Sequence, residues 1–176
     1  MRSRLVALAL CLAAVACGSK NADDQQDQHV VTYDSTSIRL VTARDTQRLR
    51  VQLAVTPDQR TMGLMERHHL AEDAGMLFLF DSTQAPDAGF WMFRTRIPLD
   101  IAYLDSTGTI AAIKAMAPCT TELAAGCPTY NPGVPFRYAL EVNSGYFQRH
   151  GVTVGSSVVP VDLAGARGRR TAPPPR

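Results

Sequence analysis

The chain has little of most features that would reveal an activity at once. It contains four cysteines, one tryptophan and only 7% aromatic residues, and its 18 basic residues are nearly balanced by 16 acidic ones. A nucleic-acid binder needs a large basic excess to displace counterions from phosphates, so this balance argues against that class. The sequence has no phosphate-binding loop, dinucleotide-binding fingerprint, nucleophile elbow or HExxH motif. We therefore expect no cofactor, no metal site and no nucleic-acid partner.

Long hydrophobic runs are also missing. The longest, Leu5 to Ala16, would measure about 18 Å as a helix, whereas the bilayer core needs about 20 apolar residues. Arg2 and Arg4 precede this run, and small residues end it. The pattern is typical of a secretory signal peptide, which we place at residues 1–16.

Cys17 directly follows the predicted signal peptide. The context is similar to that of a bacterial lipoprotein, in which the cysteine becomes the lipidated first residue, although Ala14 stands where such sites usually carry Leu. Acyl chains would hold the protein stably on a membrane. The alternative is ordinary cleavage after Ala16, which leaves a free thiol. We expect an exported, lipid-anchored protein of the cell envelope that faces the periplasm or the outside.

The mature chain is predicted to hold one domain between two flexible ends. Residues 17–37 are mostly polar and serve as the lipid-anchored tether, residues 38–163 form the domain, and residues 164–176 are a disordered tail rich in Arg and Pro. The net charge of +2 hides a tail of +4 and a central segment, residues 30–164, of −2. The domain itself is therefore mildly acidic.

Two cysteines, Cys119 and Cys127, remain after the leader and the anchor are set aside. In an exported protein we expect them to form a disulfide. A metal site and a redox-active pair are the alternatives, but no CxxC or HxxxH partner lies nearby.

Short apolar runs separated by turn residues predict a mainly β fold, a single compact β sandwich or barrel with two short helices. Thr56-Pro57-Asp58-Gln59 has the pattern of a capping box and predicts a helix to residue 67. A second short helix is expected between Asn143-Ser144 and Gly151. We expect strands at residues 48–55, 75–80, 89–93, 99–104, 109–117, 138–142 and 158–163.

A set of ordered motifs covers nearly the whole predicted domain. The motifs are Arg60-x-x-Gly63-Leu64-Met65-x-Arg67, Gly75-Met76-Leu77-Phe78-x-Phe80, Phe90-Trp91-Met92, Thr95-x-Ile97-Pro98-Leu99-Asp100-Ile101, Ala117-Pro118-Cys119, Cys127-x-x-Tyr130, Leu140-Glu141-Val142-Asn143-x-Gly145 and Gly151-Val152-x-Val154-Gly155. Together they resemble the domain of unknown function 192 family, also called uncharacterised protein family 0127. The resemblance implies a compact β-rich domain, often exported in bacteria, with no established activity. The family usually carries a basic residue and Asn where this chain has Phe93 and Arg94.

The polar and aromatic residues of these motifs are the candidate ligand-binding residues: Arg60, Arg67, Trp91, Thr95, Asp100, Tyr130, Glu141 and Asn143. Asp100 and Glu141 lie inside apolar strand patterns, and a buried carboxylate needs a partner. Arg60 and Arg67 would share one face of the predicted helix and are the natural partners. The group could be a structural ion-pair network, a site for an anionic ligand, or a pair of acid–base carboxylates. The spacing leaves open whether Asp100 and Glu141 meet.

Three functions follow from these observations. The first is a membrane-tethered cell-envelope binding or accessory module, monomeric, that recognises a small molecule or envelope ligand. The second is an enzyme that uses the Asp/Glu pair beside the arginines. The third is a periplasmic copper-handling protein, suggested by five methionines and two histidines: Met62, Met65, Met76, Met92, Met116, His68 and His69.

Overall fold

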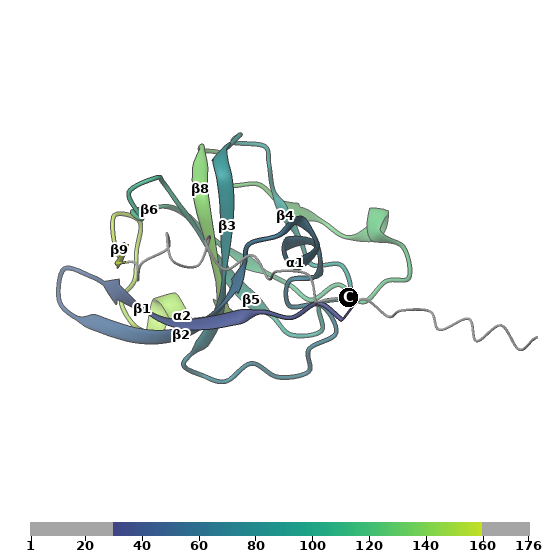
Figure 1. Ribbon diagram of the computed structural model, residues 1–176, viewed down its shortest axis with the longest axis horizontal. Coiled ribbons are helices and arrows are strands. Elements are labelled where there is room, and N and C mark those ends of the chain that lie inside the picture. The colour runs from purple at the N-terminus through teal and green to yellow at the C-terminus, as the bar shows by residue number, and fades with distance from the viewer. Residues whose placement is uncertain (1–29, 160–176) are drawn as a thin grey trace, which may run out of the picture. The chain divides into compact units, whose positions relative to one another are not determined.

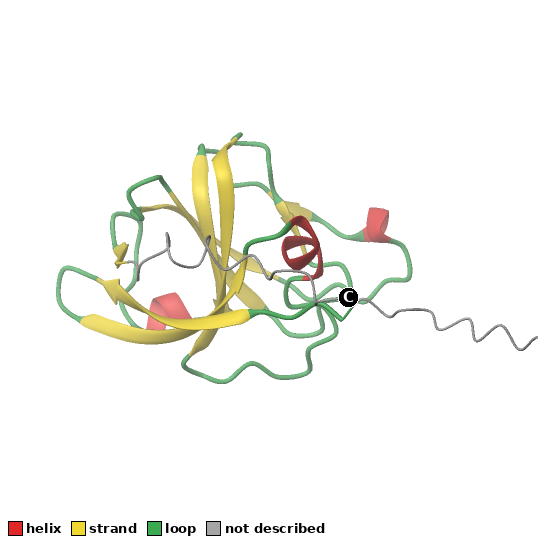
Figure 2. Cartoon of the chain, in the orientation of Figure 1, coloured by secondary structure: helices red, strands yellow, loops and turns green. Residues whose placement is uncertain are grey.

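A seven-stranded sheet is the centre of the computed structural model, which describes residues 30–159 (Figure 1). Its strands are β1 (Asp34–Val41), β2 (Thr46–Ala54), β3 (Ala74–Gln84), β5 (Leu99–Leu104), β6 (Ile110–Met116), β8 (Phe136–Asn143) and β9 (Ser157–Val159). A two-stranded sheet pairs β4 (Phe90–Trp91) with β7 (Thr129–Tyr130). The α-helices α1 (Pro57–Met62) and α2 (Tyr146–Arg149) and the 3₁₀ helix η1 (Ala124–Gly126) are all short (Figure 2). The predicted mainly β class with two short α-helices is confirmed.

The large sheet curls into a half-barrel. Its strand order is β6-β5-β8-β3-β2-β1-β9, in which β2 and β3 are parallel and the other neighbours are antiparallel. The two edge strands approach each other at one end, where the Ile110 amide donates to the Ser156 carbonyl at 2.9 Å and the Val158 amide donates to the Gly108 carbonyl at 2.8 Å. The molecule therefore follows the barrel form of the prediction and not two stacked sheets.

Each face of the curled sheet carries its own core, because successive side chains of a strand point to opposite faces. The inner cluster, between the curled strands, includes Leu49, Leu77 and Val142 and is joined by Tyr146 and Phe147 of α2. The outer cluster includes Met76, Phe78, Leu99, Ile101, Tyr103, Met116, Phe136 and Ala139 of the large sheet, together with Leu64, Leu70 and Met92 from the segments that cover it. We use the terms inner face and outer face for these two sides.

Helix α1 begins as the sequence predicts and ends earlier. The Thr56 side chain accepts from the Gln59 amide, and the Gln59 side chain accepts from the Thr56 amide, which is the predicted capping box with Pro57 in the first turn. The helix stops at Gly63, where φ is 47° and ψ is −127°, a conformation that essentially only glycine adopts. The prediction of a helix to residue 67 is therefore wrong.

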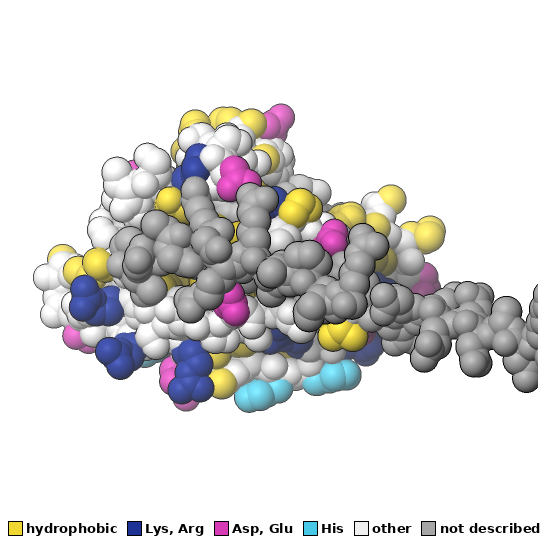
Figure 3. Space-filling view, viewed as in Figure 1, with side chains coloured by type: hydrophobic (Ala, Val, Ile, Leu, Met, Phe, Trp, Pro, Cys, Tyr) yellow, Lys and Arg dark blue, Asp and Glu magenta, His cyan; other side chains and the backbone are white. Residues whose placement is uncertain are grey.

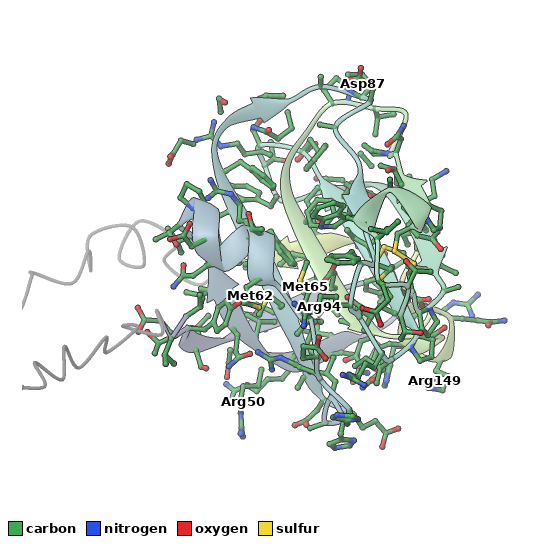
Figure 4. The ribbon with its side chains drawn as sticks, turned by 90° about the vertical axis from the view of Figure 1, so that its right-hand side faces the viewer. Arg50, Met62, Met65, Asp87, Arg94 and Arg149 are labelled. Carbon is green, nitrogen blue, oxygen red and sulfur yellow. A yellow bond between two sulfur atoms is a disulfide. The ribbon has the colours of Figure 1, made fainter. Side chains whose placement is uncertain are left out.

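Several other boundaries differ from the prediction. Strands β1 and β7 were not predicted. Strand β1 begins at Asp34, inside the predicted tether, and β4 has only two residues. Helix α2 follows Gly145, and no side chain caps it, contrary to the predicted cap at Asn143-Ser144. The predicted disulfide between Cys119 and Cys127 is present (Figure 4).

The signal peptide, the lipidation site Cys17, most of the tether and the tail from residue 164 lie outside the described residues. Within residues 30–159, no helix is long and apolar enough to cross a membrane.

Candidate functional site

A small pocket opens on the outer face, between the β2–β3 connection and the large sheet. Its space is about 30 Å³, which is enough for one or two water-sized groups. Figure 4 labels Met62 and Met65, two residues of the pocket lining, and Arg94 beside them. The pocket is lined by Arg60, Thr61, Met62, Gly63, Leu64, Met65, Phe78, Phe90, Trp91, Thr95 and Glu141. The predicted residues Arg60, Trp91, Thr95 and Glu141 are thus brought together, whereas Arg67, Asp100, Tyr130 and Asn143 are not part of the lining.

Glu141 is the buried acid of this pocket. Its side chain is only 4% exposed, and it makes no hydrogen bond or ion pair with any residue in the described range. Its neighbours across the sheet, Met76 on β3 and Ile101 on β5, are fully buried and apolar. Burial raises the pKa of Glu141 to about 8, so the carboxyl is mostly protonated at neutral pH. An unpartnered buried carboxyl is costly to stability, which makes this position a candidate for function.

Arg60 lines the pocket without pairing with Glu141. One guanidinium nitrogen, Nη1, donates to the backbone carbonyls of Val55 and Leu79, the latter at 3.0 Å. The guanidinium also lies over the ring of Phe80, 5.1 Å from its centre. Arg60 therefore ties α1 to the strands beneath it, and the prediction that it neutralises a buried carboxylate is wrong.

Arg67 lies elsewhere because α1 ends at Gly63. Its guanidinium carbon is 5.8 Å from the ring centre of Tyr33, whose hydroxyl donates to the Gly63 carbonyl at 3.2 Å. Burial raises the pKa of Tyr33, and the Arg67 charge partly opposes the rise. Arg60 and Arg67 therefore do not share a helical face as predicted.

Asp100 and Glu141 point to opposite faces of the sheet. Asp100 is paired across strands with Val142, an inner-face residue, whereas Glu141 is paired with Ile101, an outer-face residue. Directly opposite residues of a sheet share a face, so the two carboxyls are separated by the sheet itself. The hypothesis of an enzyme built on an Asp100/Glu141 pair is therefore wrong.

Asp100 instead fixes the turn that leads into α2. Its carboxylate accepts from the Gly145 amide at 2.9 Å and from the Ser144 hydroxyl at 3.5 Å. Burial raises the pKa of Asp100, and these hydrogen bonds oppose the rise. The left-handed backbone of Gly145, with φ of 76°, completes the turn.

Asn143 and Tyr130 also have structural roles. The Asn143 amide group donates to the carbonyls of Leu70 and Ala71 at 3.1 and 3.0 Å, which fastens the β2–β3 connection to β8. The Tyr130 hydroxyl accepts from the Ala117 amide at 3.0 Å and fastens β7 to the end of β6. Neither side chain lines the pocket.

The mouth of the pocket is apolar and exposed. Trp91 is 44% exposed and Met62 is 42% exposed, which is unusual for such large apolar side chains. Trp91 packs against Phe93 with 5.7 Å between ring centres. Thr95 lies deeper, at 5% exposure, and its carbonyl accepts from the amide of the disulfide-bonded Cys119 at 3.2 Å. The disulfide loop thus supports one wall of the pocket.

The lining residues that the sequence analysis did not single out are Thr61, Gly63, Leu64, Phe78 and Phe90, whereas Met62 and Met65 were named only for the copper hypothesis. Gly63, Leu64, Met65, Phe78 and Phe90 belong to the ordered motifs that carried the resemblance. Their membership of these motifs could have indicated a role in the pocket, but apolar residues in a motif are normally assigned to the hydrophobic core.

A second, larger hollow of about 420 Å³ lies beside the pocket and is polar. Glu66 accepts from Arg94 at 2.6 Å and from Arg96, and these contacts lower the pKa of Glu66, the Arg96 hydrogen bond most strongly. All three side chains are exposed, so the pairs contribute little stability.

Arg94 and Glu66 both have left-handed backbones, with φ of 55° and 59°, and the Glu66 amide donates to the Arg94 carbonyl at 2.8 Å. Asn tolerates this conformation better than most residues. Backbone geometry therefore accounts for the Asn that the resembled family usually carries at position 94.

The methionines do not gather around one metal site. Met76, Met92 and Met116 are buried in the outer cluster, and only Met62 and Met65 line the pocket. Within the part of the chain that the structure describes, no three side chains among His, Cys, Asp and Glu are grouped to hold a metal ion.

The chain is a small, mainly β domain in which the β2–β3 connection covers the outer face of a half-barrel and a buried acid, Glu141, lies beneath it. The chain belongs to the DUF192 family, described as uncharacterized ACR, whose model matches residues 39–160. No curated protein matches it.

Among the solved structures that are similar to this chain are two crystal structures. A Sinorhizobium meliloti 1021 protein described as a candidate transcription regulator is 37% identical, with a TM-score of 0.67, over 74% of this chain and 96% of that one. A protein of unknown function from Novosphingobium aromaticivorans DSM 12444 is 26% identical, with a TM-score of 0.58, over 72% of this chain and 85% of that one. The shared fold therefore comes with no established activity.

Proposed function

We propose that the protein is a binding module of the cell envelope and that the outer-face pocket around Glu141 is its recognition site. The observation that carries this proposal is the unpartnered carboxyl of Glu141, 4% exposed and directed at a pocket with an exposed apolar rim. Natural proteins keep destabilising groups of this kind mainly at sites where the group serves a function. Ligand binding would supply the missing hydrogen-bond partner.

Binding fits the pocket better than catalysis does. Glu141 and Arg60 are the ionisable groups in its lining, and a guanidinium nitrogen of Arg60 is committed to two backbone carbonyls. General acid–base catalysis of hydrolysis normally uses a second, suitably placed group. Apolar and aromatic walls with a few polar groups are instead the usual composition of a ligand-binding pocket.

A small ligand also fits the charge of the domain better than a nucleic acid does, although the Sinorhizobium relative is described as a candidate transcription regulator. Basic and acidic side chains are interspersed on the face drawn in Figure 3. A surface of this kind releases few counterions from phosphates.

The place of action is part of the same proposal. The short apolar run at residues 5–16, followed by Cys17, supports export and lipid anchoring, and the polar segment behind it supports a tether. Intact-mass analysis of the protein from membranes should show a chain that begins at Cys17 and carries acyl groups. A soluble product with an unmodified Cys17 thiol would refute the anchor while leaving the pocket untouched.

The pocket itself is tested by NMR titration of the purified mature protein with a library of small polar and charged compounds. We expect the largest amide shifts at Gly63, Leu64 and Thr95, which line the pocket. A Trp91→Ala variant should lose these shifts. The matched control is Leu123→Ala, which alters a side chain of 74% exposure outside the lining and should leave the shifts unchanged. Compounds that bind only at other surfaces would contradict the proposal.

A further inference from the structure

We infer that the outer-face pocket takes the ammonium end of a small primary amine, which pairs with the Glu141 carboxylate and lies against aromatic rings. This inference rests on the proposed function and names the chemical class of its ligand. It goes beyond the family relationship, which assigns no ligand.

The charges around the pocket favour a cation. Glu141 is the only acidic group in the lining, and no cation among the described residues pairs with it. The ionisable groups that face it are Arg60 from α1 and Tyr103 from β5. Tyr103 is a neutral donor whose hydroxyl is bonded to the Tyr130 carbonyl, and Arg60 is held by Val55 and Leu79. A cation that enters the pocket would therefore be the missing counter-charge.

The walls of the pocket also favour a cation. Phe78, Phe90 and Trp91 line the space, and Met62 and Met65 add polarisable thioethers. Aromatic faces attract ammonium groups, most strongly when the cation is desolvated. The Nη1 donor of Arg60, which an anionic ligand would need, is already committed to the carbonyls of Val55 and Leu79.

The size of the pocket limits the cation to a small one. A space of about 30 Å³ admits one or two water-sized groups, so a primary ammonium fits and a tetramethylated one does not. The remainder of the amine would lie along the exposed Trp91 and Met62 at the mouth.

Binding of a cation to a carboxyl that is mostly protonated at neutral pH must release a proton. The affinity for a primary amine should therefore rise about tenfold from pH 6 to pH 7 and level off above pH 8, the region of the Glu141 pKa. A neutral ligand that accepts a hydrogen bond from the protonated acid would show the opposite trend.

The test uses the single tryptophan of the chain, Trp91, as a fluorescent reporter at the mouth. The mature protein is titrated with n-butylammonium between pH 6 and pH 9, with 1-butanol as the neutral counterpart and tetramethylammonium as the oversized one. We expect saturable binding of butylammonium with the stated pH dependence, and at least tenfold weaker binding of the other two. N-acetyl-lysine amide is titrated in parallel. Its binding would identify a lysine side chain as a source of the group, and its failure would identify a free amine.

Two variants locate the effect. Glu141→Gln should bind butylammonium at least tenfold more weakly at pH 8 and lose the pH dependence. Gln52→Leu is the matched control, because Gln52 lies in the same cross-strand row beyond Met76 and has a buried, unbonded Oε1, but does not line the pocket. It should bind butylammonium as the unmodified protein does.

Equal binding of 1-butanol, or an affinity that is flat or falls with pH, would overturn the ammonium inference. The pocket would then remain a recognition site for another ligand. No response to any of these amines, together with NMR shifts at Gly63 and Thr95 from other compounds, would likewise overturn only the inference. Failure of both experiments would remove the proposed function as well.

Discussion

Replacement of Glu141 with glutamine should stabilise the protein at neutral pH. In the unfolded chain the carboxyl has a pKa of 4.5, and in the folded protein burial raises the pKa to about 8. Between pH 4.5 and about pH 8, Glu141 is ionised in the unfolded chain but still protonated in the folded protein. The free energy of unfolding of the native protein therefore falls as pH rises through this range, and glutamine, which does not titrate, escapes that loss.

The size of the effect follows from the same two values. Each pH unit in that range costs about 1.4 kcal/mol, so ionisation in the unfolded state costs the native protein about 3 kcal/mol at pH 7. The amide of glutamine would also be buried without a partner, which lowers the stability of the variant by about 1 kcal/mol. We expect Glu141→Gln to be more stable by about 2 kcal/mol at pH 7 and slightly less stable at pH 4.5.

Urea denaturation of both proteins, with the disulfide intact, at pH 4.5, 5.5, 6.5, 7.5 and 8.5 measures this difference. Other titrating groups, such as Asp100, are common to both proteins and cancel in the subtraction. The difference should grow by about 1.4 kcal/mol per pH unit and become constant above pH 8. A difference that does not vary with pH would refute the claim that Glu141 is held protonated without a partner.

Three further predictions concern the scaffold of the pocket. Reduction of the disulfide between Cys119 and Cys127, or Cys→Ser substitution of both, should lower stability by about 2.5 kcal/mol and shift the Trp91 emission, because the loop supports Thr95; two free thiols in the mass of the exported protein would contradict this. Gly63→Ala should cost about 1–3 kcal/mol in urea denaturation, since φ of 47° with ψ of −127° is strained for alanine; unchanged stability would show that the turn relaxes. Arg94→Asn should raise stability by about 0.5 kcal/mol in a thermal melt by easing the left-handed backbone; a loss of more than 1 kcal/mol would assign the exposed pairing with Glu66 a larger role.

The local parts of the fold were predictable because the responsible interactions are close in sequence. The alternation from Arg48 to Val55 predicts β2, and the capping box at Thr56 predicts the start of α1. The end of α1 was missed because Gly63 was read as an ordinary helical residue, although it adopts a backbone that only glycine tolerates. The strand β1 was not predicted at all, because its first half, Asp34-Ser35-Thr36-Ser37, is polar and exposed at most positions.

The site was predictable in composition but not in geometry. Glu141 and Asp100 were both recognised as carboxyls in apolar strands, yet the faces they occupy depend on the register between β5 and β8. The pairing of Ile101 with Glu141 is a long-range relation that spacing along the chain does not encode. The partners of Arg60 were also unforeseeable, since backbone carbonyls leave no mark in the sequence.

The parallel pairing of β2 with β3 has a consequence for how the family can diversify. Two adjacent parallel strands require a connection that crosses a face of the sheet, and here that connection carries Arg60 to Met65, one whole wall of the pocket. The sheet register fixes both ends of the connection, but it does not fix the length between them. Insertions or deletions there would reshape the pocket mouth while the strands keep their pairing. The same property makes this segment the natural place to graft new specificities onto the half-barrel.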